Sequence, residues 1–203
     1  MGPEREPSNH PLKYELAAPH VKEALARLNR AGWVKRGVQN PETVQEHTEA
    51  LINLASALSN NLPEFSELEK QEMVSMLEIH DWPESIVGDQ IIVNPDPIEK
   101  EKLKATKYQQ EYEAMQQICS NLGDTGSEIF NLWLRFENSS DKVAVLARQI
   151  DMYQAIEKAL EYEKLGYPVS TQDFISYAEP TVIHPVLIQR LTDLKKQLLT
   201  LKQ

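Results

Sequence analysis

Apolar residues with helical spacing run through most of this sequence and limit what the chain can fold into. Apolar side chains recur three or four residues apart, as in the stripes Val44/Leu51/Leu54/Leu58 and Val143/Leu146/Ala147/Ile150. No segment alternates apolar and polar residues in the way that a half-buried strand does. A chain of 203 residues fits one domain. We therefore expect an all-α fold, built as a single-domain helical bundle.

Caps and breakers set the expected helix boundaries. Gly32 can end the first helix, Asn40 before Pro41 can begin the second, and Ser66 opens a capping box before the third, which Pro83 limits. The expected helices cover residues 19–31, 41–58, 67–82, 99–122, 129–136 and 140–164, the last capped by Ser139 or Ser140, with one more after Pro185. We expect loops over 33–38 and 123–126, a flexible segment over 1–11 and a folded domain over 12–203.

The net charge of the chain limits the classes of partner that it can bind. A formal net charge of −10 argues against a nucleic acid polymer and against an anionic membrane surface, because both bind basic faces. No apolar run reaches the ~20 residues of a transmembrane helix, and the N-terminus lacks the apolar segment of a signal peptide. A single cysteine excludes a zinc cluster built from cysteines. We expect a cytoplasmic enzyme or binding protein with a small-molecule ligand.

Four polar residues lie on or beside the apolar faces of the expected helices. His80 and Asp81 continue the inward face of the third helix, His47 lies on the stripe of the second, and Asp151 follows the last residue of the 143–150 stripe. Two imidazoles with two carboxylates suit a divalent ion such as Mn²⁺, Fe²⁺, Co²⁺ or Zn²⁺. Taken singly, each is equally a buried core histidine or an aspartate in a salt bridge, so spacing alone leaves the metal site open.

Ordered blocks of this sequence resemble a known family. The blocks are RAGWVKRGVQNPETVQEH at 30–47, IHDWPESIVGD at 79–89 and QID at 149–151, and shorter likenesses follow at 132–137, 161–163 and 184–185. They resemble the HD-domain metal-dependent phosphohydrolases, in particular the HD-domain-containing protein 2 group and the bacterial 5′-deoxynucleotidases. The resemblance covers roughly residues 12–194. It implies an HD-type helical bundle that hydrolyses deoxyribonucleoside 5′-monophosphates to deoxynucleosides and phosphate.

The resemblance also implies roles for single residues. A divalent ion (Mn, Co, Mg, Fe or Zn) would be held by His47, His80, Asp81 and Asp151. Glu84 would be the catalytic carboxylate. A second ion could bind between Glu84 and Asp89.

The resemblance implies three more residues as substrate-binding, and the basic pair Lys35 and Arg36 offers a further cation by its charge alone. Arg30 would hold the phosphate, with Arg36 as an alternative cation, Trp33 would shape the pocket, and Asp89 would contact substrate or share the second ion with Glu84. Without the resemblance, these residues suit plainer roles: Trp33 a core position, Asp89 a turn and Arg36 a solvated loop.

The sequence departs from the family pattern at two places. Relatives often carry a Glu where this chain has Gln154, and they have a more polar or Pro-containing loop where it has Gln90-Ile91-Ile92-Val93. These departures leave substrate choice and a second metal open. The alternatives are an HD hydrolase of another small phosphoester or of a nucleoside triphosphate, and a non-catalytic nucleotide-binding HD protein. The long helix from residue 99 and the Leu-rich C-terminus could support a homodimer.

Overall fold

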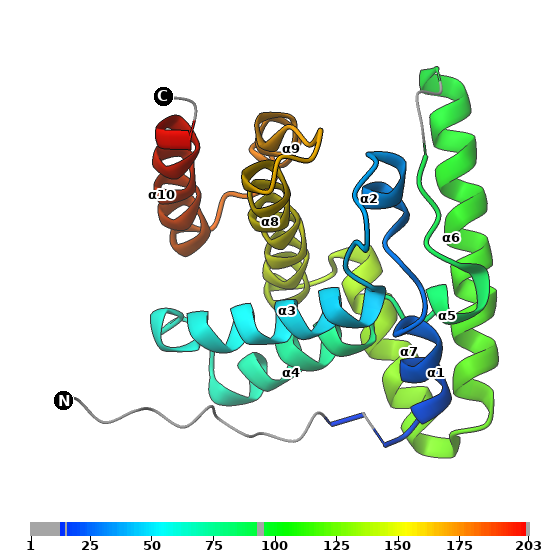
Figure 1. The fold of residues 1–203 in the computed structure, drawn as a ribbon. Helices are drawn as coiled ribbons and strands as arrows, with labels where there is room; N and C mark the ends of the chain where they lie inside the picture. The colour runs from blue at the N-terminus through cyan, green and yellow to red at the C-terminus, as the bar shows by residue number, and fades with distance from the viewer. Residues whose placement is uncertain (1–12, 15, 93–95, 202–203) are drawn as a thin grey trace.

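The computed structural model describes residues 13–14, 16–92 and 96–201, and the expected all-α fold is confirmed for them (Figure 1). The first half comprises α1 (Pro19–Leu25), α2 (Ala31–Lys35), α3 (Val44–Leu58), the 3₁₀ turn η1 (Ser59–Asn61), α4 (Glu67–Ile79) and α5 (Glu84–Val87). The second half comprises α6 (Pro97–Ser120), α7 (Gly123–Asn138), α8 (Lys142–Lys164), α9 (Thr171–Ala178) and α10 (Pro185–Leu201). The expected flexible segment over 1–11 lies outside the described residues.

Helix α8 is the centre of the molecule. It packs against α3, α4, α7, α9 and α10, and Figure 1 shows α3 and α4 crossing one end of it. Its buried residues fall on several faces rather than on one stripe, among them Ala147, Ile150, Tyr153 and Ile156. A helix that is buried nearly all round belongs to the interior. Polar groups on α8, such as Asp151, are therefore held by packing from several directions.

The chain after α1 differs from the expected long first helix. Helix α1 ends at Leu25, and residues 31–35, most of which were expected as loop, form α2 with Gly32 inside it. Extended pairing between Asn29 and Thr43 interrupts the helix, because the amide of Val44 donates to the Leu28 carbonyl. This pairing sets the start of α2 beside the start of α3.

Of the two expected helix starts, the one at Ser66 is observed and the one at Asn40 and Pro41 is not. Helix α3 begins at Val44 rather than at Pro41, because Thr43 forms a capping box in which its hydroxyl and the Glu46 carboxylate each accept a backbone amide. The predicted capping box at Ser66 is confirmed for α4. Helix α4 ends at Ile79, and His80 is its C-cap residue.

Later boundaries also shift. Residues 123–126 belong to α7 rather than to a separate turn, and Asp141 caps α8 in place of the expected Ser139 or Ser140. The Asp141 carboxylate accepts the amides of Val143 and Ala144, whereas Ser139 takes the left-handed conformation that ends α7. Helix α9 was not expected.

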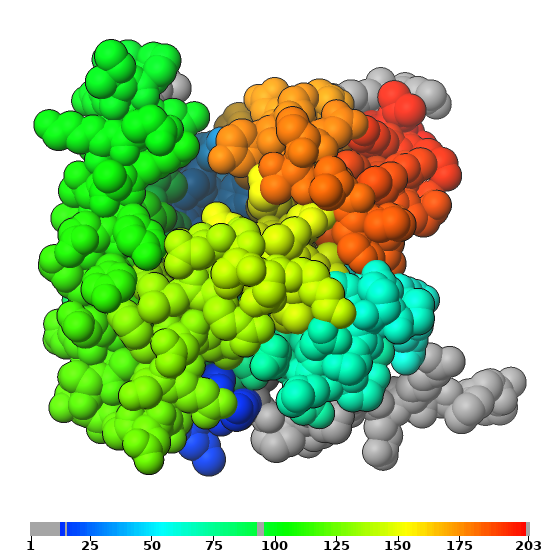
Figure 2. All heavy atoms as spheres, turned by 180° about the vertical axis from the view of Figure 1, so that it is seen from behind, coloured from blue at the N-terminus to red at the C-terminus, as the bar shows by residue number. Residues whose placement is uncertain are grey.

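Two outer helices differ in how they pack. The buried residues of α6 all come from its C-terminal half, and its N-terminal half extends along the edge of the molecule (Figures 1 and 2). The leucines of α10 mostly face inward, because Leu187, Leu191, Leu194 and Leu198 are all buried. The exposed C-terminal leucine surface expected for a dimer is therefore reduced to Leu199 and Leu201. Among the described helices, none combines the length and apolar character of a membrane span.

Candidate active site

The four residues predicted as metal ligands meet in the interior. His47 is fully buried in the second turn of α3, His80 ends α4 and Asp151 lies in the middle of α8. One ligand atom from each of these three lies within 4.8 Å of the other two. The Oδ2 atom of Asp81 lies 3.1 Å from His80 Nε2 and 3.8 Å from His47 Nε2. Three helices that are distant in sequence therefore converge on one point.

Hydrogen bonds set which nitrogen of each imidazole is free. His47 Nδ1 lies 2.8 Å from the side-chain oxygen of Gln154, and His80 Nδ1 lies 2.9 Å from the carbonyl of Leu77. Both partners are acceptors, so both Nδ1 atoms carry hydrogen and donate it. The Nε2 atom of each neutral ring is then left with a lone pair, which is the form that binds a metal ion.

These lone pairs face carboxylates across short distances. His47 Nε2 lies 3.1 Å from Asp151 Oδ1, and the buried His80 Nε2 makes no hydrogen bond among the described residues although Asp81 Oδ2 is 3.1 Å away. Facing acceptors repel unless a proton or a cation lies between them. Two imidazole nitrogens with carboxylate oxygens form a donor set for a divalent transition ion. These residues therefore fit the ion that the site chemistry implies.

The acid–base properties of the site reflect this crowding. Burial lowers the pKa of His80, but the neighbouring Asp81 outweighs burial and raises that pKa to about 9. Burial also opposes ionisation of Asp81 and Asp151, but the adjacent imidazoles lower the pKa of both carboxyls overall. Without a bound ion the site therefore favours a proton on His80, which an incoming cation would displace.

Glu84 lies next to this cluster, at the first position of the short helix α5. The turn that follows α4 places it there, because the Glu84 amide donates to the Asp81 carbonyl. Its side chain is 5% exposed, and its Oε2 atom has no hydrogen-bond partner among the described residues. Burial is the main cause that raises the pKa of the Glu84 carboxyl to about 10, and the negative charges of Asp81 and Asp89 raise it further. The positive charges of Arg30 and Lys107 oppose this rise. A buried carboxyl of this kind can hold and deliver a proton.

Arg30 and Asp89 also lie beside the cluster. Arg30 Nη1 is 3.2 Å from Asp81 Oδ2, and the charge of Asp81, working against burial, raises the Arg30 pKa. Asp89 Oδ2 accepts the backbone amide of Ala31 at 2.7 Å. The two residues thus join the start of α2 to the segment that follows α4. Within the described part of the chain, Asp89 accepts a single hydrogen bond, so its carboxylate has further lone pairs with which it could bind a second ion.

Trp33 and Arg36 contact residues outside the His and Asp cluster. Trp33 is buried, donates its indole N–H to Glu42 at 2.8 Å, and packs against Tyr162 and Phe174. The Arg36 guanidinium lies over the Phe174 ring and donates to the Gly32 carbonyl. These contacts attach α2 to α8 and α9. Neither residue contacts the His and Asp cluster through these interactions, and their substrate roles stay predictions.

Sequence reasoning missed two residues on α6 and the role of one on α8. Lys107 Nζ lies 4.0 Å from Glu84 Oε1 and 3.3 Å from Glu111 Oε1. The four-residue spacing of Lys107 and Glu111 was the available signal, but it is typical of any solvated helix. Gln154 was noticed as a departure from the family pattern, and its contact with His47 became visible only in the fold.

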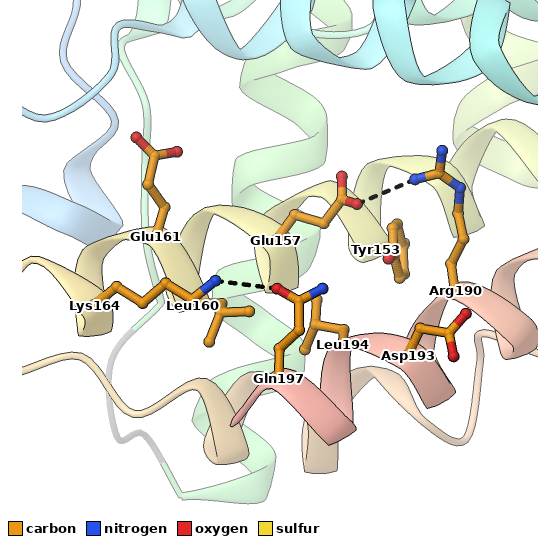
Figure 3. Close-up of a pocket in the computed structure, with 9 residues that line it drawn as sticks. All are labelled: Tyr153, Glu157, Leu160, Glu161, Lys164, Arg190, Asp193, Leu194 and Gln197. Atoms are coloured by element: carbon orange, nitrogen blue, oxygen red, sulfur yellow. Dashed lines mark hydrogen bonds and ion pairs between the residues drawn. The ribbon is translucent and has the colours of Figure 1, made fainter. Parts of the chain in front are cut away.

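A separate cavity of about 560 Å³ lies between α8 and α10 (Figure 3). Two polar contacts cross it, because Arg190 pairs with Glu157 at 3.3 Å and Lys164 donates to Gln197 at 3.1 Å. Its lining includes none of the predicted site residues. The polar side chains drawn across it largely partner one another, so we assign it no ligand.

Comparisons with known proteins agree with this geometry. A family model described as an HD domain matches residues 23–184. The chain is 34% identical over 175 residues to the 5′-deoxynucleotidase HDDC2 of Homo sapiens, a match that covers 85% of this chain and 80% of the human protein. It is 33% identical over 170 residues to the 5′-deoxynucleotidase HDDC2 of Dictyostelium discoideum, covering 80% of this chain and 86% of that protein.

A solved structure shows a similar fold. The crystal structure of the PH0347 protein from Pyrococcus horikoshii OT3 superposes with a TM-score of 0.67 at 22% identity, covering 92% of this chain and 99% of that one. At this identity the likeness concerns the fold alone. The family model and the human relative confirm the resemblance noted in the sequence, since the blocks at 30–47, 79–89 and 149–151 lie within residues 23–184. The family model and the relatives show that this chain belongs to the HD-domain family.

Proposed function

We propose that this protein is a metal-dependent phosphohydrolase that converts deoxyribonucleoside 5′-monophosphates to deoxynucleosides and phosphate. The observation that carries the proposal is the meeting of His47, His80 and Asp151 beside the buried Glu84. A donor set with open positions next to a proton-holding carboxyl suits phosphoester hydrolysis. Relatives named 5′-deoxynucleotidase, matched over most of their length, support the substrate class.

The metal-binding residues in this proposal are His47, His80, Asp81 and Asp151. A bound divalent ion supplies Lewis-acid charge that polarises a phosphoryl oxygen and makes water more acidic. The protein's own part is to keep both Nε2 lone pairs directed to one point, through the Nδ1 hydrogen bonds to Gln154 and Leu77. Mn, Co, Mg, Fe and Zn are the candidates for this ion, and a second one would use Glu84 with Asp89.

Glu84 handles the proton and Arg30 the phosphate in this proposal. The raised pKa of Glu84 favours its protonated form at neutral pH, which suits donation to the leaving 5′-oxygen. Arg30 pairs with Asp81 in the described state, and its planar guanidinium can also contact a phosphate oxygen. Trp33, Arg36 and Asp89 complete the proposed substrate side.

Phosphate release from a panel of substrates tests the function. Purified protein loaded with Mn²⁺, Co²⁺ or Mg²⁺ should release phosphate from deoxyribonucleoside 5′-monophosphates faster than from ribonucleotides. Glu84→Gln should keep its metal by elemental analysis and lose about 10²- to 10⁴-fold in kcat, the usual worth of general acid–base catalysis. His80→Ala should lose both metal and activity. No release from any substrate by the metal-loaded wild type would overturn the proposal.

The same panel separates the alternatives. Release only from nucleoside triphosphates or sugar phosphates would identify another HD phosphohydrolase. Nucleotide binding without release, unchanged in Glu84→Gln, would identify a non-catalytic nucleotide-binding protein. The segment at 90–92 is the reason to test for another HD phosphohydrolase. Gln90 and Ile91 lie between the site and α6 in the chain, and they depart from the family pattern.

Location and assembly form part of the proposal. We place the protein in the cytoplasm, where a small nucleotide substrate and an acidic protein surface are both ordinary. We also propose a homodimer, whose apolar contact would use Ile188, Leu199 and Leu201, the exposed apolar residues of α10. Sedimentation of wild type against Leu199→Glu tests the dimer: the wild type should sediment as a dimer and the variant as a monomer.

A further inference from the structure

Lys107 on α6 reaches the active-site region, unlike the lysine one turn before it. The Lys107 side chain is 28% exposed, whereas Lys104 is 53% exposed and pairs with Glu101 on its own helix. The burial of Lys107 is costly for a cation unless partners compensate for it. Its contacts therefore show what holds it there.

Three segments of the chain meet at the Lys107 ammonium. It lies 3.3 Å from Glu111 Oε1 on α6, donates to the Gln90 carbonyl at 3.0 Å, and lies 4.0 Å from Glu84 Oε1 on α5. The ammonium donates a hydrogen bond to the Gln90 carbonyl and lies within ion-pair distance of the two carboxyl oxygens, with Glu84 the farther of them. A second contact joins the same segments, since the Gln90 side chain donates to Gln110 at 3.0 Å.

The two oxygens of Glu84 have different surroundings. Oε1 is the atom nearest to Lys107, whereas the buried Oε2 has no hydrogen-bond partner among the described residues. A contact of the Lys107 ammonium with Oε1 restrains the carboxyl and leaves Oε2 to carry the proton. The rest of the α5 region is a single short turn, Glu84–Val87, which has few bonds of its own to fix a side chain.

We propose that Lys107 is a positioning residue: it holds Glu84 through Oε1, fastens the 88–92 segment to α6, and leaves Oε2 available for proton transfer. This inference rests on the proposed function, because it gives Lys107 its role through Glu84. It makes α6 a wall of the active site rather than only an outer helix. It also explains why a largely exposed helix buries one cation in its middle.

Steady-state kinetics with three variants tests the inference. Lys107→Met removes the charge and keeps most of the side-chain volume, Lys107→Arg keeps the charge, and Lys104→Met is the matched control on the same helix. We expect kcat of Lys107→Met to fall about 10- to 100-fold, as a small misplacement of a catalytic group does. KM should stay within about threefold, because Lys107 positions Glu84 and does not itself contact the substrate. Lys107→Arg should recover part of kcat, and Lys104→Met should match wild type.

Hydrogen exchange adds a measurement that does not depend on activity. Amides of residues 84–92 should exchange faster in Lys107→Met than in wild type or Lys104→Met, because the segment has lost its attachment to α6. If Lys107→Met does not fold by circular dichroism, Lys107→Gln replaces it under the same criteria.

Several results would overturn the inference. A raised KM with unchanged kcat would mean that Lys107 contacts substrate directly. Wild-type kcat and unchanged exchange in Lys107→Met would overturn the positioning role and leave the proposed function intact. Absence of phosphate release from wild type would overturn the proposed function and this inference with it.

Discussion

The position of one proton on each imidazole determines what His47 and His80 can bind. His80 donates to a backbone carbonyl, which no side-chain substitution removes, whereas His47 donates to the side chain of Gln154. Gln154 is buried and is a neutral acceptor, so it orients the ring while withdrawing less of the proton than a carboxylate would. The two histidines therefore differ in how their orientation is secured.

Removing the Gln154 side chain should weaken metal binding. In Gln154→Ala the His47 Nδ1–H loses its acceptor, so the ring can turn or change tautomer, and affinity for Mn²⁺ should fall about 10- to 100-fold. Calorimetric titration of metal-free protein measures the change. Gln154→Glu, which keeps an acceptor at the same place, should bind at least as tightly as wild type. Equal affinity in Gln154→Ala and wild type would contradict the orienting role.

At the scale of the element, the ends of α3 and α4 set the positions of the histidines His47 and His80. Helices α3 and α4 both begin with a capping box, at Thr43 and at Ser66. His47 follows its cap by one turn, whereas His80 lies at the far end of α4. Loss of the first cap should therefore disturb a ligand directly, and loss of the second should affect stability alone.

Thr43→Ala and Ser66→Ala form a matched pair that tests this difference. Each should lower the free energy of unfolding by about 1 kcal/mol, the usual cost of removing a cap. Only Thr43→Ala should also weaken Mn²⁺ affinity, because fraying of the first turn of α3 moves His47. Chemical denaturation and metal titration of both variants measure the two effects. A similar loss of affinity in Ser66→Ala would show that general destabilisation, rather than the local cap, controls the site.

Helix α6 should make stability depend on pH through Glu111. Burial, and secondarily the charge of Glu137, raises the pKa of the Glu111 carboxyl to about 7, against the opposing charge of Lys107. The folded state thus holds this proton more tightly than the unfolded state, whose value is 4.5. The stabilisation that Glu111 contributes to the folded state is fully present below pH 4.5, and it is lost as pH rises through about 7. The loss is about 3 kcal/mol, since one pKa unit is about 1.4 kcal/mol.

Denaturation of wild type and Glu111→Gln across this pH range measures that contribution. The variant has no proton to lose, so the free energy of unfolding of wild type relative to Glu111→Gln should decline between pH 4.5 and 7. If the difference in free energy of unfolding between the two proteins stays constant with pH, Glu111 has the same pKa in the folded and unfolded states. The comparison is internal, because all other carboxyls are shared by the two proteins.

The helices that could be predicted are those with long apolar stripes. The stripes that contain Leu51 and Ile150 identified α3 and α8, and the Ser66 box identified the start of α4. Errors arose where contacts from distant segments outweigh local preference. Asn40 and Pro41 suit a helix start, but residue 43 pairs with residue 29, Asn40 takes a left-handed conformation, and α3 begins only at Val44. Helix α9 has only eight residues, too few for a stripe to be distinctive.

At the scale of the molecule, the convergence of the four polar residues was predictable because they lie on or beside the inner faces of three helices, whereas their metal-binding role came from the family resemblance. Any packing that buries those faces brings His47, His80 and Asp151 toward one core. Lys107 was not predictable, because its approach to Glu84 depends on how α6 lies beside α5. Trp33 was assigned to the substrate side by resemblance and Arg36 by its charge; their described contacts lie with α8 and α9, and their substrate roles stay predictions. Periodicity predicts which side faces inward but not which neighbour it meets.

Removal of the metal should lower the stability of the whole fold, because its ligands join α3, α4 and α8. An ion at about 100 times its Kd stabilises the folded state by about 2.7 kcal/mol. For a chain of this size that amounts to a fall in Tm of about 5–10 °C on chelation. Thermal scans of Mn²⁺-loaded protein with and without chelator measure it, and restored Mn²⁺ should reverse it. His80→Ala should show no shift, because it lacks the buried Nε2 that faces Asp81. An equal shift in that variant would mean that the stabilising ion binds elsewhere, and an unchanged wild-type Tm would mean that packing alone holds the three helices together.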